Sequence, residues 1–476
     1  MNCQILRKIF ALLILLLIFT FVFETGQLAQ SVNTQRQPPT ETTEKLALTN
    51  VTLIDGNGGK PRTMTTLIVS QGRITDIFST GSKKIPADAK IMDLSGKFMM
   101  PGLVDSHVHL ATQERPPGMM NGILRNALLG GVTTVRDMGG NGVIVAALAE
   151  EANKGVIPSP RIYYSSLIIG ADSTFWMTDA KGKFVSNGMP PGKTAWFRQV
   201  TQGMDIVKII SESKAFGATG IKIPGGFTPP LLKQLSLEAH RQGLKVWSHA
   251  SGEPSRPSDA VNAGVEVLSH SEMLGFEGLK DSSPYAESDY GVKALEVVRT
   301  IPVQSNAVTK LLERMKKKGS VLEPTLFIMA LFQSNATDEN KKQSLKARLD
   351  YACRITQRAK EMRIPMVAGS DNIGGGSPNL HSELQLLVKC GLSPLEAITA
   401  ATLNGARILG IERDYGTIEI GKVADLIILS ANPSADIRNT ETIEYVMKGG
   451  KLYKLEQPLR TPPLAEAPLP ISTQKN

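Results

Sequence analysis

The stretch PGLVDSHVHL (101–110) places two histidines one residue apart, directly after a Pro-Gly turn and an apolar pair. Side chains alternate faces along a β-strand, so His107 and His109 would point to the same face and could share one ion. An HxH pattern alone is weak evidence, because a histidine at a strand end more often forms hydrogen bonds at a rim. Whether this pair binds a metal therefore depends on the other polar residues of the chain.

Further residues of metal-binding type follow short apolar segments later in the sequence. His249 ends KVWSH, His270 ends VEVLSH, and Asp371 follows MVAGS. Four of the six histidines thus fall at three predicted strand ends, with a carboxylate at a fourth. Imidazole and carboxylate ligands suit Zn²⁺ and also Mn, Fe or Co, which the sequence does not separate. The pattern predicts a divalent-metal site.

Lys222, in GATGIKIPGG, is a candidate of a different kind. An ammonium group has no lone pair to offer a cation. Carbamylation by CO₂ would turn the amine into a carboxylate that can bridge two metals; the alternative is a lysine paired with a carboxylate inside the fold. Lys208, in DIVKII, competes for the role, but its apolar neighbours lead at helical spacing to a glycine. We therefore expect Lys208 on the surface of a helix.

Eight apolar segments that alternate with helical stretches would position these residues. The predicted strands are 99–110, 131–140, 161–170, 217–226, 243–252, 264–273, 320–329 and 364–373. Eight β/α units predict a (β/α)₈ TIM barrel, in which the carboxyl ends of the parallel strands meet at one mouth. The long connections 171–200 and 275–305 would lie over that mouth.

Two β-rich segments flank the predicted barrel (101–410), whose end at 393–410 reads as a capped helical pair. Residues 45–100 and 411–454 show alternating apolar residues between Gly-containing turns, and each is too small for a core of its own. They predict one small β-sandwich built from both ends of the chain. Residues 31–44 read as a polar linker, and the Pro-rich segment 455–476 as a disordered tail.

Residues 1–30 read as a signal peptide or an N-terminal anchor. Arg7 and Lys8 precede an apolar run over 9–23, which is shorter than the roughly 20 residues of a membrane span. We expect an exported protein, periplasmic or extracellular, with membrane contact only through this segment if it is not cleaved. Cys353 and Cys390 are too few for a disulfide framework, so stability must come from a large core.

The net charge of +9 is spread along the chain, with no basic run longer than 316–318. This distribution indicates a solvated surface and argues against a nucleic-acid partner.

Taken together, PGLVDSHVHL, GVTTVRDMGG, GATGIKI, AHRQGLKVWSHA, GVEVLSH, AGSDN, LHSELQLLV and GTIEIGKVADLIIL resemble the amidohydrolase superfamily over about residues 45–454. The similarity is greatest to the imidazolonepropionase-related branch, which contains exported Xaa-Pro and other dipeptidases. The resemblance implies two divalent metals, zinc first among them: one held by His107, His109 and Asp371, the other by His249 and His270. A carboxylated Lys222 would bridge both.

The resemblance also implies a reaction, the hydrolysis of C–N amide bonds in small peptides or N-acyl compounds. A metal-activated hydroxide would attack the carbonyl, and Asp371 would act as general base and then general acid. We expect a small-molecule or small-peptide substrate and a homo-oligomer.

Four further residues are candidate substrate contacts, each with a structural alternative: His381, Arg136, Tyr163 and Tyr164. His381 could instead be a helix-cap or loop residue. Arg136, with Asp137, reads first as a structural ion pair or turn. One of the two tyrosines must face away from the barrel, and His240 reads as helix surface.

Two other functions compete with amide hydrolysis. Deaminases of the superfamily carry a catalytic Glu three residues after the equivalent of His249 and use one metal, whereas here Glu253 follows by four residues and Lys222 is present. A mononuclear deaminase or cyclic-amide hydrolase is therefore the alternative. A catalytically dead binding scaffold is the third possibility, and the complete ligand set argues against it.

Overall fold

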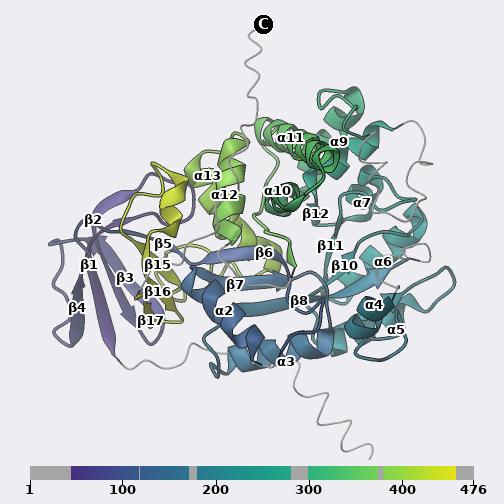
Figure 1. Ribbon diagram of the computed structural model, residues 1–476. Helices are drawn as coiled ribbons and strands as arrows, with labels where there is room; N and C mark the ends of the chain where they lie inside the picture. The colour runs from purple at the N-terminus through teal and green to yellow at the C-terminus, as the bar shows by residue number, and fades with distance from the viewer. Residues whose placement is uncertain (1–43, 117, 171–178, 280–297, 374–378, 457–476) are drawn as a thin grey trace, which may run out of the picture.

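The molecule has two parts, a barrel and a separate β-sheet (Figure 1). The structure is a computed structural model that describes residues 44–116, 118–170, 179–279, 298–373 and 379–456. The predicted leader and nearly all of the predicted linker and tail lie outside the described residues. Among the residues described, no helix is both long enough and apolar enough to cross a membrane.

Seven parallel strands form most of the barrel wall, in the order in which they follow along the chain. They are β6 (Leu103–His109), β7 (Val132–Asp137), β8 (Arg161–Ile169), β10 (Gly220–Ile223), β11 (Lys245–His249), β12 (Val267–Ser269) and β13 (Val321–Glu323). A short strand, β9 (Phe197–Gln199), pairs with β8 outside this path. The parallel pairing and the order confirm the predicted barrel.

The predicted eighth strand is a strand only at its end. Residues Asn372–Ile373 form β14, which pairs with β6, and an isolated bridge joins Met366 to Leu322 of β13. The backbone N–H of Asp371 also donates to the carbonyl of His107 at 2.8 Å. Pro365 has no N–H to donate and Asp371 has a left-handed φ of 51°, so a regular ladder is interrupted. The segment closes the barrel nonetheless.

Helices surround this sheet (Figure 1). They are α2 (Met119–Leu129), α3 (Gly142–Asn153), α4 (Asp179–Val185), α5 (Ile206–Ala215), α6 (Pro229–Arg241), α7 (Pro257–Ala263), α9 (Asn306–Lys318), α10 (Leu326–Asn335), α11 (Glu339–Glu361), α12 (Asn379–Lys389), α13 (Pro394–Ala400) and α14 (Leu403–Leu409), with short 3₁₀ segments η1 (Ser271–Gly278) and η3 (Ile437–Glu441). Lys208 on α5 and His240 on α6 are exposed, as the sequence predicts. A disulfide joins Cys353 on α11 to Cys390, the residue after α12.

The β-rich ends of the chain form one mixed sheet. Its strands are β1 (Lys45–Leu53), β2 (Arg62–Ser70), β3 (Arg73–Ser79), β4 (Ala89–Asp93), β5 (Phe98–Pro101), β15 (Leu426–Leu429), β16 (Ile443–Lys448) and β17 (Lys451–Lys454). Their order is β17-β16-β15-β5-β1-β2-β3, with β4 beside β1. The antiparallel pairing of β5 with β15 joins the two ends of the chain, as predicted.

This sheet encloses a hydrophobic core of its own. At the far edge, the N–H of Ile74 in β3 donates to the carbonyl of Lys422 at 2.9 Å, and Arg73 forms an isolated bridge with Val423, just before β15. The enclosed side chains are apolar and buried; they include Leu48, Val51, Leu67, Ile74, Met99, Leu426 and Ile428. The hydrophobic effect of burying this set holds the two chain ends together.

The sheet is fastened to the barrel by buried polar contacts as well as by the chain itself. An ion pair joins Arg161, at the start of β8, to Asp425, next to β15. The Lys448 ammonium of β16 donates to the carbonyl of Ser159 at 2.6 Å. Burial lowers the pKa of Lys448 to about 7, and the neighbouring Arg161 adds to this effect. The contact between the sheet and the barrel therefore buries the Lys448 amine, where desolvation disfavours its charged form.

Candidate metal centre at the barrel mouth

Asp371 lies at the centre of a cluster of imidazole rings where the barrel strands end. Its Oδ1 is 3.3 Å from His109 Nε2 and 3.5 Å from His107 Nε2, and its Oδ2 is 3.8 Å from His270 Nδ1. One potential ligand atom from each of His107, His270 and Asp371 lies within 4.8 Å of the others. Residues that are up to 264 positions apart in the sequence thus offer nitrogen and oxygen atoms to one ion-sized space.

The remaining two predicted ligands border the same cluster. The His249 ring at the end of β11 packs edge-on against the His270 ring, with 4.6 Å between centroids. Lys222 of β10 is buried, and its Nζ donates to Ser269 Oγ at 3.3 Å. Its positive charge helps to lower the pKa values of His107, His249 and His270. The structure therefore brings together all six residues that the sequence analysis selected as metal ligands.

Hydrogen bonds at Nδ1 orient three of the rings. Nδ1 of His107 contacts Glu323 Oε2 at 2.8 Å, that of His109 contacts the carbonyl of Gly139 at 2.7 Å, and that of His270 contacts Thr325 Oγ1 at 2.8 Å. Because a carbonyl only accepts, His109 Nδ1 carries a proton, while Nε2 of the same ring faces Asp371 Oδ1 at 3.3 Å.

The residues present fit a divalent cation. His107 Nε2 is buried and has no hydrogen-bond partner among the described residues, although buried polar atoms normally have one. It faces Asp371, whose oxygens are acceptors as well. A cation is the partner that would satisfy both atoms at once, and imidazole nitrogen with carboxylate oxygen is a zinc-type donor set.

Burial and the mutual fields of these groups shift their titration. Burial lowers the pKa values of His107 and His249 well below the ordinary range, and the charge of Lys222 adds to this effect. Burial alone would raise the pKa of Asp371, but the surrounding imidazoles outweigh it and hold the pKa low. Burial lowers the pKa of Lys222 to about 7. His109 differs, because its contacts with Asp371 outweigh burial and raise its pKa. The neutral imidazoles of His107 and His249, an ionised carboxylate and an amine that readily loses its proton are forms that bind metals or react with CO₂.

A buried carboxyl that the sequence analysis did not select fixes the position of Asp371. Asp105 of β6 accepts from the Ser370 hydroxyl at 2.6 Å and from the Ser370 N–H at 3.0 Å. It also accepts from the His107 N–H at 3.2 Å. The segment that carries Asp371 is thereby tied to the strand that carries His107.

Arg136 belongs to the wall of the barrel beneath this cluster. It is fully buried, and its Nη2 donates to Glu323 Oε1 at 2.7 Å while its Nε donates to the Ser106 carbonyl at 2.5 Å. The guanidinium lies over the Trp247 ring, 4.5 Å from the centroid. This geometry is that of a structural ion pair, which was the first interpretation of Arg136. Its partner Glu323 was not predicted, although it is the one charged residue in SVLEPTLFIM.

The other three predicted substrate contacts are not brought to the cluster. Tyr163 packs inside the barrel with apolar side chains that include Trp247, whereas Tyr164 faces the surrounding helices and donates to the Phe216 carbonyl at 3.2 Å. His381 on α12 contacts Thr440 Oγ1 and the carbonyl of Gly130, each at 2.9 Å. Strand alternation separates the two tyrosines, and both ring nitrogens of His381 are engaged elsewhere.

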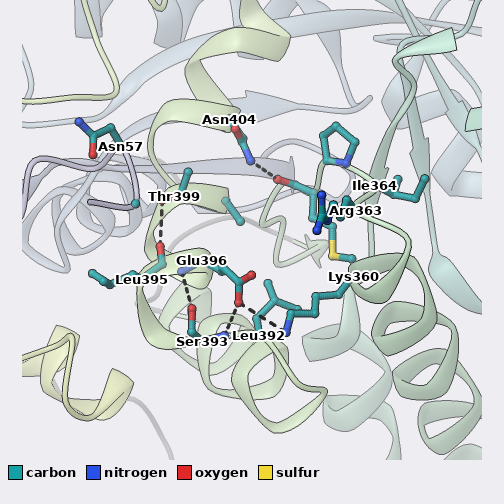
Figure 2. A pocket seen from close by; sticks show the side chains of 14 residues that line it. Asn57, Lys360, Arg363, Ile364, Leu392, Ser393, Leu395, Glu396, Thr399 and Asn404 are labelled. Atoms are coloured by element: carbon teal, nitrogen blue, oxygen red, sulfur yellow. Dashed lines mark hydrogen bonds and ion pairs between the residues drawn. The ribbon is translucent and has the colours of Figure 1, made fainter. Parts of the chain in front are cut away.

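A cavity of about 420 Å³ opens on another side of the barrel, between the end of α11, α13 and Asn57 in the loop that joins β1 to β2 (Figure 2). Hydrogen bonds within its wall join Asn404 to the Met366 carbonyl and Glu396 to Ser393. None of the predicted site residues lines it. The metal centre and this cavity are therefore separate features.

A parallel barrel with imidazole and carboxylate side chains gathered at its mouth defines a class, the metal-dependent barrel enzymes. The amidohydrolase family model matches residues 98–453. The chain belongs to that family, and it is a hydrolase that acts on carbon–nitrogen bonds.

Individual relatives agree with this assignment. The chain is similar to an ochratoxinase of Aspergillus niger, with 26% identity over 402 residues that cover 75% of each chain. It is also similar to an imidazolonepropionase of Brevibacillus brevis, with 22% identity over 75% of this chain and 79% of the relative. Among solved structures, a Xaa-Pro dipeptidase with bound methionine superposes with a TM-score of 0.68 at 22% identity, covering 86% of this chain and 100% of the other.

Proposed function

We propose that this protein is a two-metal hydrolase of amide bonds in small peptides or N-acyl compounds. The observation that carries the proposal is the convergence of Lys222 with four imidazoles and one carboxylate in a single buried cluster. Carboxylated by CO₂, Lys222 would supply an anionic oxygen ligand to each of two ions.

The contacts support the ligand assignment that the family resemblance implies. His107, His109 and Asp371 would hold one ion, because both rings direct Nε2 at the same Oδ1. The adjacent rings of His249 and His270 would hold the other. We propose zinc in both positions, since neutral imidazole and carboxylate ligands suit it. When bound, such metals lower the pKa of a water molecule and polarise a scissile carbonyl.

The role proposed for Asp371 is proton transfer. Its oxygens lie 3.3–3.8 Å from three of the imidazoles that would hold the ions, so a water bound there would be within reach of this carboxylate. The carboxylate can then take a proton from that water and return it to the leaving nitrogen. The hydrogen bonds from Ser370 to Asp105 hold this segment in place during both transfers.

The test combines metal analysis with a substrate screen. We expect two metal ions per purified chain, and hydrolysis of some dipeptides or N-acyl amino acids that stops on chelation. Lys222→Ala should lose bound metal and activity, whereas Lys208→Ala, an exposed lysine on α5, should retain both. One tightly bound ion per active chain, or ammonia release from aminated heterocycles without amide hydrolysis, would contradict the proposal.

We also propose that the protein is exported. The apolar leader supports this, and so does the disulfide between Cys353 and Cys390, because such bonds persist mainly in oxidising compartments. Expression of the full chain in a bacterial host, followed by fractionation and thiol alkylation, tests this proposal. Protein in the cytoplasmic fraction with both thiols free would oppose it.

A further inference from the structure

The end of β13 contributes no metal ligand to the proposed centre, yet it contacts both halves of it. Glu323 Oε2 contacts His107 Nδ1 at 2.8 Å and accepts from the Ser269 hydroxyl at 2.7 Å. Two residues later, Thr325 Oγ1 contacts His270 Nδ1 at 2.8 Å. Glu323 and Thr325 are both fully buried. One tripeptide thus touches a ring from each proposed metal position.

The Thr325 contact determines which nitrogen of His270 carries the proton. The hydroxyl also lies 2.8 Å from the carbonyl of Pro324, its own neighbour. Two oxygen acceptors at that distance repel unless a proton lies between them, and a hydroxyl has one proton to give. Thr325 therefore donates to Pro324 and accepts from His270 Nδ1–H, which leaves Nε2 of that ring unprotonated.

The Thr325 hydroxyl does not cap the helix that it precedes. Thr325 is the N-cap of α10, where threonine normally accepts a hydrogen bond from its own helix, but its side chain makes no such bond. Glu383 of α12 replaces it and accepts from the Phe327 N–H at 2.7 Å.

The strain at Thr325 supports the same conclusion. Its φ is 53°, in the left-handed region that a β-branched residue rarely adopts. A conformation of this kind persists only where the surroundings determine it, and such positions cluster at functional sites. Glycine would relieve the strain but would not supply the hydroxyl.

We infer that the segment 323–325 is an orienting element of the metal centre, in which Glu323 positions His107 and Thr325 positions His270. The inference rests on the proposed function, since the oriented nitrogens are those that would hold the two ions. Hydrogen bonds of this kind around a ligand typically change metal affinity by about 10–100-fold when they are removed.

Metal affinity of the purified chain tests the inference without reference to activity. Metal-free protein is titrated with Zn²⁺ against a chromophoric chelator, and bound metal is counted by mass spectrometry. Thr325→Val should weaken one of the two ions by about 10–100-fold and leave the other unchanged. Thr325→Ser, which keeps the hydroxyl, should bind both as the parent does. Thr356→Val is the matched control: its buried hydroxyl on α11 contacts Ser271 Oγ and the Ala352 carbonyl, but no imidazole.

Ring tautomers provide a second measurement that needs no Thr325 variant. The chain has six histidines, so selective ¹⁵N labelling of the metal-free protein gives few signals, assigned by single His→Gln substitutions. We expect Nδ1–H in both His107 and His270. An Nε2–H tautomer at His270, or equal Zn²⁺ affinities of Thr325→Val and Thr325→Ser, would overturn the inference. A parent protein that binds no second ion would overturn the proposed function instead.

Discussion

The buried ion pair between Arg136 and Glu323 allows a test that separates a structural role of Arg136 from a substrate-binding role. Both side chains have 0% exposure, and the Nη2–Oε1 distance is 2.7 Å. Arg136→Met keeps the length and removes the charge. Removing one partner of a buried ion pair typically costs about 3–5 kcal/mol. Glu323 retains donors from His107 and Ser269, so we expect the lower end, about 3 kcal/mol.

The assay is urea unfolding of the metal-free protein at neutral pH, with a double-mutant cycle. Glu323→Gln is the second single variant, and the double variant removes both charges together. We expect the double variant to be more stable than the sum of the single losses predicts, by about 1–3 kcal/mol, since neither charge is left alone. Arg125→Met, at an exposed position on α2, should change stability by less than about 0.5 kcal/mol.

A loss below about 1 kcal/mol in Arg136→Met would refute this reasoning, because it would lie in the range of ordinary surface substitutions. Such a result, together with a raised KM and an unchanged kcat, would return Arg136 to the role of a substrate contact. A large coupling energy with Glu323 would exclude that role.

Three further outcomes are expected. The disulfide between Cys353 and Cys390 spans 37 residues, so Cys390→Ala should lower the free energy of unfolding by up to about 4 kcal/mol in urea titrations; a reductant without effect on the parent would contradict this. Lys448 has a pKa of about 7 in the folded protein against the ordinary 10.5. Between those pH values the unfolded chain binds one more proton, so stability should rise with pH by up to about 1.4 kcal/mol per unit relative to Lys448→Met; parallel curves would argue against a buried amine. A Cβ at Gly170 would collide with the backbone of Gly226, so Gly170→Ala should lower the melting temperature, whereas Gly122→Ala, in α2 with open space around it, should gain about 0.5–1 kcal/mol. Equal melting temperatures for the two glycine variants would contradict this prediction, because they would show that the backbone around Gly170 and Gly226 moves apart without cost.

The sequence predicts those site residues whose position follows from strand order. His107, His109, His249 and His270 each follow an apolar run, and the carboxyl ends of parallel strands converge by the geometry of the fold. The strand alternation that aligned His107 with His109 also required Tyr163 and Tyr164 to separate. How far each tyrosine lies from the mouth of the barrel depends on the register of β8 with its neighbouring strands. No local signal in the sequence specifies that register.

The residues that support the ligands could not be predicted in the same way. Glu323 contacts His107 across 216 residues of chain, and Asp105 contacts Ser370 across 265. The first contact joins β13 to β6 past the intervening segment 366–373, and the second depends on how that segment lies against β6. Each also depends on a single rotamer. Thr325 was hidden further, because the apolar pattern predicts a strand over 320–329, whereas β13 ends at Glu323 and α10 begins at Leu326. A charged residue inside an apolar strand, as in SVLEPTLFIM, was the one available signal, and it indicates a buried partner without naming it.

The pairing of β5 with β15 has a consequence for the order in which the protein folds during synthesis. Pro101 of β5 lies opposite Leu426 of β15. About 325 residues must therefore be synthesised after β5 is complete before β15 can pair with it. At roughly 5–20 residues per second on the ribosome, that interval is about 16–65 s. The inner edge of β5 stays unpaired throughout, and an open strand edge is a template for aggregation. Shielding of residues 45–101 by a chaperone, or by the secretion machinery, would therefore raise the yield of native protein.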